Sequence, residues 1–150
     1  VTFEDSTWHE LPWKFEAGTP VIAQGIALAE ACDYLDDIGM ENVKAHGEHL
    51  AEYAYDRLTE EFEDIQILGP PGDDRSALVS FNLDNVHAHD TSEILNEFAV
   101  AVRAGDHCTQ PLHDKLGIAA SARASFYIYN TEEEVDKLVE ALEATEDLFA

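Results

Sequence analysis

A cysteine in a polar loop that contains glycine is the most reactive candidate in this sequence. The segment Arg103-Ala-Gly-Asp-His-Cys108-Thr-Gln-Pro111 places Cys108 beside His107 and shortly after Arg103. Neighbouring positive charge favours the thiolate, which is the nucleophilic form of cysteine. Cys108 is therefore a candidate nucleophile, with Arg103 and His107 in support. The alternative from the local sequence is an inert or metal-bound cysteine.

Two further segments carry the chemistry of anion binding. Arg123 lies in a strongly alternating stretch, where a buried guanidinium needs an anion and matches a carboxylate with two hydrogen bonds. Gly18 and Thr19 precede an apolar helical stretch, so backbone N–H groups, a hydroxyl and the helix dipole suit a phosphate there. The alternatives are an internal salt bridge for Arg123 and an ordinary helix cap at Thr19.

The histidines give a weaker signal for a metal site. Most of them fall in three groups, namely His46 with His49, His87 with His89, and His107 with His113. No tight zinc spacing such as paired Cys-x-x-Cys accompanies them, so we expect no metal. His46 and His49 are interpreted as residues on the surface of a helix.

The hydrophobic pattern predicts an α+β domain in which helices cover a small mixed or antiparallel sheet. The predicted helices span residues 20–38, 42–62, 91–98 and the stretch after 131, with one helical turn over 112–116. The predicted strands span residues 65–68, 77–83, 100–103 and 122–129. Residues 1–19 form an irregular arm, and residues 20–150 form one small domain. Because the helix over 20–38 is apolar on nearly every side, we expect it to be buried.

The composition limits the partners and the environment. The chain has 150 residues with 32 acidic and 8 basic side chains, a formal net charge of −24. Nucleic acid and anionic membranes are disfavoured as partners, and no apolar run reaches the roughly 20 residues of a membrane span. Such acidity with an ordinary apolar content is typical of a salt-accumulating cytoplasm, the alternative being an acidic mesophilic protein. Cys32 and Cys108 are expected to be reduced there.

Several segments together resemble the SUF-type (group II) cysteine desulfurases, in the fold-type I, class-V aminotransferase-like superfamily of pyridoxal-phosphate enzymes. The segments that carry the resemblance are, in chain order, Leu11-Pro-Trp-Lys-Phe-Glu-Ala-Gly-Thr-Pro20, Val79-Ser-Phe-Asn-Leu83, Val86-His-Ala-His-Asp90, Ala101-Val-Arg-Ala-Gly-Asp-His-Cys-Thr-Gln-Pro111, Arg123-Ala-Ser and Tyr129-Asn-Thr131. The resemblance implies the small C-terminal domain of such an enzyme, from a halophile.

The resemblance also implies a role for each candidate residue. Cys108 would take the sulfur of L-cysteine as a persulfide, release L-alanine, and pass the sulfur to a SUF-type acceptor for iron–sulfur cluster assembly. Arg123 would bind the substrate carboxylate, with Arg103 in support. Gly18 and Thr19 would bind the phosphate of the cofactor, pyridoxal 5′-phosphate, in the other subunit of a homodimer.

The sequence departs from the family pattern at two points. Asp106 stands where the family usually has a second histidine, and an acid there opposes formation of the thiolate. The family's cofactor-binding lysine lies in its N-terminal domain, and none of the lysines here has a matching context. Because the chain begins at Val1 and its sole methionine is Met40, we expect a C-terminal fragment that is inactive alone.

The sequence leaves three alternatives open. A selenocysteine lyase of the same superfamily would use the same loop. A non-catalytic module that binds metal or protein, or a structural or regulatory partner, would not need Cys108 for catalysis.

Overall fold

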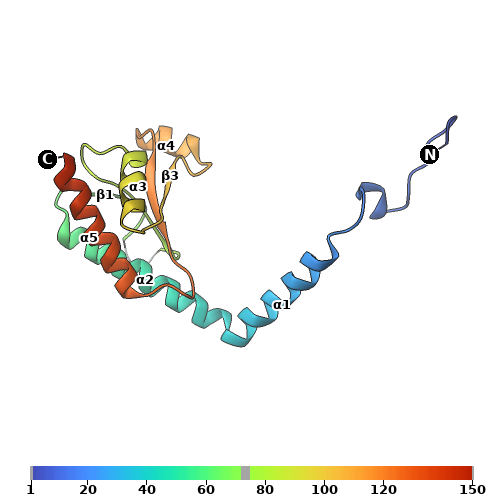
Figure 1. The fold of residues 1–150 in the computed structure, drawn as a ribbon, viewed down its shortest axis with the longest axis horizontal. Helices are drawn as coiled ribbons and strands as arrows, with labels where there is room; N and C mark the ends of the chain where they lie inside the picture. Colours follow the sequence, from blue (N-terminus) through green and yellow to red (C-terminus); the bar gives the residue numbers. More distant parts are fainter. Residues whose placement is uncertain (1, 72–74, 150) are drawn as a thin grey trace. The chain divides into compact units, whose positions relative to one another are not determined.

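The computed structural model describes residues 2–71 and 75–149, and it divides into two compact units after Ile38 (Figure 1). The first unit contains a short 3-10 helix, η1 (Trp13–Phe15), and the longer helix α1 (Ile22–Ile38). Outside η1, residues 2–21 form no regular helix or strand. The aromatic side chains of this arm, Trp8, Trp13 and Phe15, are exposed.

Helix α1 corrects one expectation from the sequence. None of its residues is buried, and its apolar residues Ile22, Ile26 and Leu28 are largely exposed. The expected burial of this helix is therefore wrong for this structure, because apolar side chains are buried only where another element packs on them. The second unit begins at Gly39, after α1. Gly39 separates α1 from the next helix and has a φ of +89°, a conformation that glycine adopts readily.

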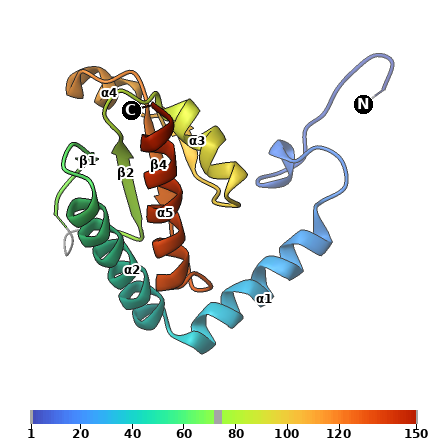
Figure 2. The ribbon, with the colours of Figure 1, turned by 60° about the vertical axis from the view of Figure 1, so that its left-hand side comes forward.

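The second unit contains four helices and a four-stranded antiparallel sheet (Figure 2). Its helices are α2 (Met40–Glu61), α3 (Ala88–Glu97), α4 (Gln110–Leu116) and α5 (Glu132–Phe149). Its strands are β1 (Gln66–Leu68), β2 (Leu78–Asn82), β3 (Arg103–Gly105) and β4 (Ser121–Ser125), in the order β1-β2-β4-β3. The predicted α+β class is confirmed, and the sheet is antiparallel throughout.

The alternation of side chains along β2 and β4 gives the sheet two different faces. Val79 and Phe81 on β2, with Ala122 and Ala124 on β4, are buried in the hydrophobic core. Helices α2, α3 and α5 supply the other half of this core, with the buried leucines and valines Leu50, Leu58, Leu95, Val135, Val139 and Leu142. The opposite face carries the alternate residues of β2 and β4, and this is the face that holds the candidate site.

Polar contacts between α2 and the α5 region hold the helical layer together. Tyr53 Oη and Arg57 Nε both donate to Asp136 Oδ1 at 3.0 Å. Hydrogen bonds from Arg57 and Tyr53 lower the pKa of the Asp136 carboxyl. His49 Nε2 lies 2.7 Å from Glu132 Oε1, and His46 Nε2 lies 3.1 Å from the Asn130 carbonyl oxygen. His49 is exposed as expected, whereas His46 is half-buried and joins α2 to the start of α5.

Two further expectations from the sequence concern the cysteines and membrane-spanning helices. Cys32 and Cys108 are both free thiols, as predicted, and both are exposed. Within the described ranges of the chain, no helix combines the length and the apolar character needed to cross a membrane.

Candidate functional site

The cysteine lies in a tight turn between β3 and α4, residues 106–109, which we call the thiol turn. Strand β3 ends at Gly105, whose φ is +131°. His107 and Cys108 follow with φ values of +53° and +62°, so two consecutive residues with side chains take the left-handed conformation. Cys108 is exposed, as a nucleophile that receives a group from another molecule must be.

Two arginines flank the thiol turn on adjacent strands. Arg103 Nη2 donates to Cys108 Sγ at 3.6 Å. Arg103 on β3 is also the direct partner of Arg123 on β4 in the antiparallel register. The structure thus brings together Cys108, Arg103 and Arg123, the three residues that the sequence singled out around this loop.

Neither arginine has a carboxylate partner in the described part of the chain. The hydrogen bond of the Arg123 side chain runs from Nε to Ser125 Oγ, at 3.1 Å. The alternative of an internal salt bridge for Arg123 is therefore not found among these residues, although the chain has 32 acids. Like charges directly opposite each other destabilise a sheet, so the pair is a ready site for an anion. The planar guanidinium matches a carboxylate with two hydrogen bonds.

The half-buried side chain of His107 contacts the sheet. Its Nε2 lies 3.1 Å from Ser121 Oγ on β4, and His113 Nε2 on α4 lies 3.1 Å from the same oxygen. Burial, with a further contribution from the charge of Arg123, lowers the pKa of His107, so the ring is neutral near pH 7. Its buried Nδ1 has no hydrogen-bond partner within the described residues.

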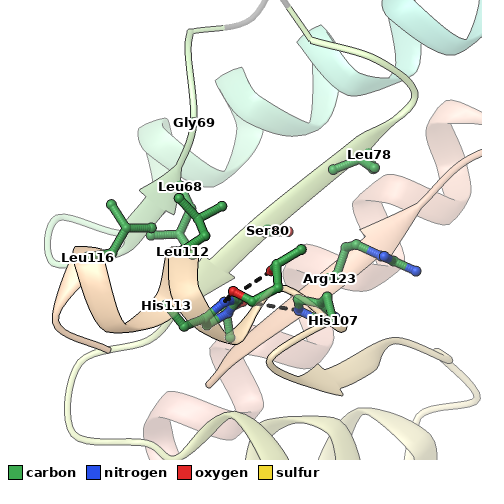
Figure 3. Close-up of a pocket in the computed structure, with 11 residues that line it drawn as sticks. Leu68, Gly69, Leu78, Ser80, His107, Leu112, His113, Leu116 and Arg123 are labelled. Atoms are coloured by element: carbon green, nitrogen blue, oxygen red, sulfur yellow. Dashed lines mark hydrogen bonds between the residues drawn. The ribbon is translucent and has the colours of Figure 1, made fainter. Parts of the chain in front are cut away.

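An open pocket of about 360 Å³ lies on this face of the sheet (Figure 3). Leu68, Leu112 and Leu116 gather at one end of it, and His107 and Arg123 lie at the other. The pocket therefore offers an apolar wall beside a cationic and hydrogen-bonding one. Such a combination is typical of a site for a small molecule with one anionic group.

Gly18 and Thr19 belong to the first unit, and the structure does not place them relative to Cys108. Gly18 has a φ of +76°, and the position of its missing Cβ is open, with no atom within 4 Å. No hydrogen bond between described residues uses the Thr19 hydroxyl, and α1 begins just after it at Ile22. Free donors ahead of a long helix fit the phosphate of a cofactor.

The remaining histidines do not assemble a metal centre. Over residues 2–71 and 75–149, no group of three or more His, Cys, Asp or Glu side chains is arranged to hold a metal ion. His87 and His89 stack on each other with ring centroids 5.2 Å apart. His87 Nδ1 accepts from the backbone N–H of His89, so this residue serves as the N-cap of α3.

Sequence reasoning missed Ser121 and Thr109, which support the thiol turn, and considered His113 only as a possible metal ligand. Ser121 and His113 are buried, and Thr109 Oγ1 lies 3.3 Å from His113 Nδ1. Two spacing patterns in the sequence could have identified these residues. Ser121 shares a face of β4 with Arg123 because alternate residues of a strand point the same way, and Thr109 and His113 have the spacing of neighbours on a helix.

Residues 1–138 match the aminotransferase class-V family. The chain belongs to the class-V aminotransferase family. Within this family, it is 77% identical over 150 residues to a protein of Haloferax volcanii named cysteine desulfurase, covering all of this chain and 35% of that protein. It is 67% identical over 150 residues to a probable cysteine desulfurase of Halobacterium salinarum, covering all of this chain and 36% of that protein.

Solved structures of class-V aminotransferases agree with the fold. A cysteine desulfurase of Escherichia coli matches with a TM-score of 0.86 and 36% identity, covering all of this chain and 37% of that one. A cysteine desulfurase of Thermococcus onnurineus matches with a TM-score of 0.83 and 34% identity over 99% of this chain and 36% of that one. The chain thus spans about a third of the length of the relatives it matches. The expected superfamily is confirmed, and the halophilic sources of the two archaeal relatives agree with the acidic composition.

Proposed function

We propose that this chain is the part of a pyridoxal-phosphate-dependent cysteine desulfurase that carries the sulfur-accepting cysteine and the clamp for the substrate carboxylate. The observation that carries the proposal is the cluster of Cys108, Arg103 and Arg123. An exposed thiol contacts one guanidinium, and a second guanidinium lies directly opposite the first without a carboxylate partner among the described residues. The names of the relatives support the same activity.

The reaction proposed is the conversion of L-cysteine and the Cys108 thiol into L-alanine and a Cys108 persulfide. The C–S bond of the substrate breaks, an S–S bond to Cys108 forms, and the thiol hydrogens are conserved between alanine and persulfide. Pyridoxal phosphate, when bound, supplies the electron-withdrawing system that makes the substrate C–S bond labile. Arg103 favours the thiolate of Cys108, which is the form that attacks sulfur.

The other residues of the site orient the substrate. Arg123 binds its carboxylate through two hydrogen bonds, and this fixes the amino acid at one end of the pocket. His107 lines the same pocket, and its neutral ring adds no further positive charge to the two arginines. Gly18 and Thr19 would hold the cofactor phosphate across a homodimer interface.

The cofactor's lysine anchor is proposed to come from outside this chain. All lysines here, Lys14, Lys44, Lys115 and Lys137, are exposed, as a lysine that holds an aldehyde inside a closed site is not. We therefore propose that the chain alone is inactive and that the longer protein works as a cytoplasmic homodimer. Its sulfur would pass to a SUF-type acceptor for iron–sulfur cluster assembly.

A chimeric enzyme tests the proposal. The 150 matching residues of the Haloferax volcanii protein are replaced by this chain, and the product is incubated with pyridoxal phosphate and L-cysteine in molar KCl. We expect alanine to form and mass spectrometry to find one added sulfur on the peptide that contains Cys108. The peptide that contains Cys32 is the internal control, because this thiol is also free and exposed. Alanine formation without sulfur on Cys108 would contradict the assigned role, and preference for selenocysteine would identify a lyase of the same superfamily.

Replacing Arg123 tests the carboxylate clamp. In the chimera, we expect Arg123→Met to lower kcat/KM by about 10²–10³-fold, mainly through KM, because two charge-assisted hydrogen bonds are lost. Arg123→Lys should recover only part of this, since an ammonium does not reproduce the guanidinium fork. Arg57→Met is the matched control, because Arg57 pairs with Asp136 away from the site. An unchanged KM in Arg123→Met would rule out the clamp.

A further inference from the structure

We infer that Asp106 is a positioning residue for Cys108, whose carboxylate holds the thiol turn in the conformation that keeps Sγ against Arg103. The inference rests on the proposed function, because it takes Cys108 to be the sulfur acceptor. It reverses the expectation from the sequence, in which an acid at this position only opposes the thiolate.

The side-chain carboxylate and the backbone carbonyl of Asp106 both accept hydrogen bonds inside the thiol turn. Its Oδ1 accepts a hydrogen bond from the Cys108 backbone N–H at 2.9 Å. Its carbonyl oxygen accepts from the Thr109 N–H at 2.8 Å and from the Thr109 hydroxyl at 2.7 Å. The side chain of Asp106 therefore fixes the amide of the cysteine itself, and the main chain of Asp106 closes the turn behind it.

The backbone of the turn needs this support. His107 and Cys108 both carry a Cβ and both have positive φ, which crowds the side chain against the backbone. Such conformations persist at functional sites when the surrounding structure holds them in place. Without the carboxylate, the Cys108 amide loses its partner and the turn can relax toward negative φ, which moves Sγ away from Arg103.

A chain of directed hydrogen bonds ties the remainder of the turn to α4 and β4. Thr109 gives its hydroxyl proton to the Asp106 carbonyl, so its oxygen accepts from His113 Nδ1, which also faces the Thr109 carbonyl at 3.3 Å. His113 Nε2 and His107 Nε2 each lie 3.1 Å from Ser121 Oγ, and Figure 3 marks these two hydrogen bonds with dashed lines. These hydrogen bonds fix the side chains of His107, Thr109 and His113. The hydrogen bond from the Cys108 N–H to Asp106 Oδ1 joins the cysteine to the same network.

The carboxylate has two effects on the thiolate, and they have opposite signs. Its charge disfavours a second negative charge nearby, whereas the turn it maintains brings Sγ to within 3.6 Å of Arg103. The other charged or titratable groups that face the turn are Arg103 on β3, Arg123 on β4, His113 on α4 and His107 of the turn itself. The thiolate is stabilised more by the position of Sγ beside Arg103 than it is destabilised by the charge of Asp106.

The test measures the rate at which iodoacetamide alkylates Cys108 as a function of pH, in this chain with Cys32→Ser to remove the other thiol. We expect Asp106→Ala to raise the pH midpoint of the alkylation rate by about half to one unit, because the thiolate loses Arg103. Asp106→Asn keeps an acceptor oxygen and removes the charge, so its midpoint should equal that of the parent or fall below it. Asp106→Glu keeps the charge but misplaces the oxygen, so its midpoint should rise.

Arg103→Met provides the matched comparison. It should raise the midpoint at least as much as Asp106→Ala, because it removes the same contact and keeps the opposing charge of Asp106. Adding Arg103→Met to Asp106→Ala should give no further rise, because the contact is already lost. If Asp106→Ala lowers the midpoint as Asp106→Asn does, or if Asp106→Glu leaves it unchanged, the carboxylate acts through charge alone and the inference is wrong. Should Asp106→Ala fail to fold, Asp106→Asn and Asp106→Glu still give opposite expectations.

This assay needs neither cofactor nor turnover, so its outcome is separate from that of the proposed function. A chimera that forms no persulfide, combined with the expected alkylation profiles, would reject the desulfurase activity and leave the positioning role of Asp106 intact. A chimera that transfers sulfur, combined with a lowered midpoint in Asp106→Ala, would support the desulfurase activity and reject the positioning role of Asp106.

Discussion

Replacing Cys108 by serine is expected to abolish sulfur transfer in the chimeric enzyme, with a fall in turnover of at least about 10³-fold. A serine hydroxyl is not ionised near neutral pH, and its oxygen cannot carry the transferred sulfur as a persulfide. The structure gives a reason for such a large effect. Cys108 is the thiol that contacts Arg103, whereas Cys32 lies on α1 in the other unit.

The measurements are alanine production and the sulfur bound to protein, each compared with Cys32→Ser. The Cys32→Ser chimera should keep both, and the Cys108→Ser chimera should lose both while it still binds pyridoxal phosphate, as its absorbance spectrum would show. Alanine production that survives in Cys108→Ser would show that another group accepts the sulfur. It would also support the alternative of a module in which Cys108 has no catalytic role.

Salt is expected to have the second large effect, on stability. The chain carries a net charge of −24, and raising the salt from 0.1 M to 1 M shortens the screening length from about 10 Å to about 3 Å. Relief of the repulsion between carboxylates should therefore stabilise the compact state. Screening that recovers about 4 kcal/mol corresponds to a rise of roughly 10–20 °C in Tm for a domain of this size.

One carboxyl pair shows this repulsion in the structure. A hydrogen bond to Glu61, with smaller contributions from burial and from the charges of Glu61 and Glu140, raises the pKa of Glu143. A carboxyl group whose pKa is raised in the folded state lowers the free energy of unfolding at pH values above that pKa. This loss of stability decreases as the pH falls through the folded-state pKa. Mild acidification at low salt should therefore partly replace added KCl.

Thermal melting over a series of KCl concentrations, followed by circular dichroism, measures the effect. Glu143→Gln should raise the Tm at low salt and reduce the gain on adding KCl, because it removes one of the repelling charges. A Tm that stays constant or falls as KCl is added would contradict the electrostatic explanation and favour an acidic protein adapted to low salt.

Local patterns predicted the core of the fold well. The ranges 77–83 and 122–129 were predicted as strands, and in the structure they contain β2 and most of β4, whose residues Val79, Phe81 and Ala124 are buried. The helix predicted after residue 131 begins at Glu132, and the Glu134 carboxylate accepts from the Thr131 backbone N–H at 3.2 Å. These features depend on residues close together in sequence, which is why a single sequence contains them.

Features that depend on distant contacts were predicted less well. Helix α3 begins at Ala88, before the expected residue 91, because the ring nitrogen of His87 replaces the usual oxygen as its cap. The strand expected over 100–103 forms at 103–105, because pairing with β4 begins at Arg103. Arg103 and Arg123 were both chosen as site residues, but their position directly opposite each other depends on this register.

The register of Arg103 and Arg123 also links anion binding to the position of Cys108. Strand β3 is short and lies at an edge of the sheet, and repulsion between the two guanidiniums weakens its attachment to β4. An anion bound between the two guanidiniums would remove this repulsion and strengthen the pairing of β3 with β4. Since the thiol turn follows β3 directly, an anion bound to both arginines would also support the position of Cys108 beside Arg103.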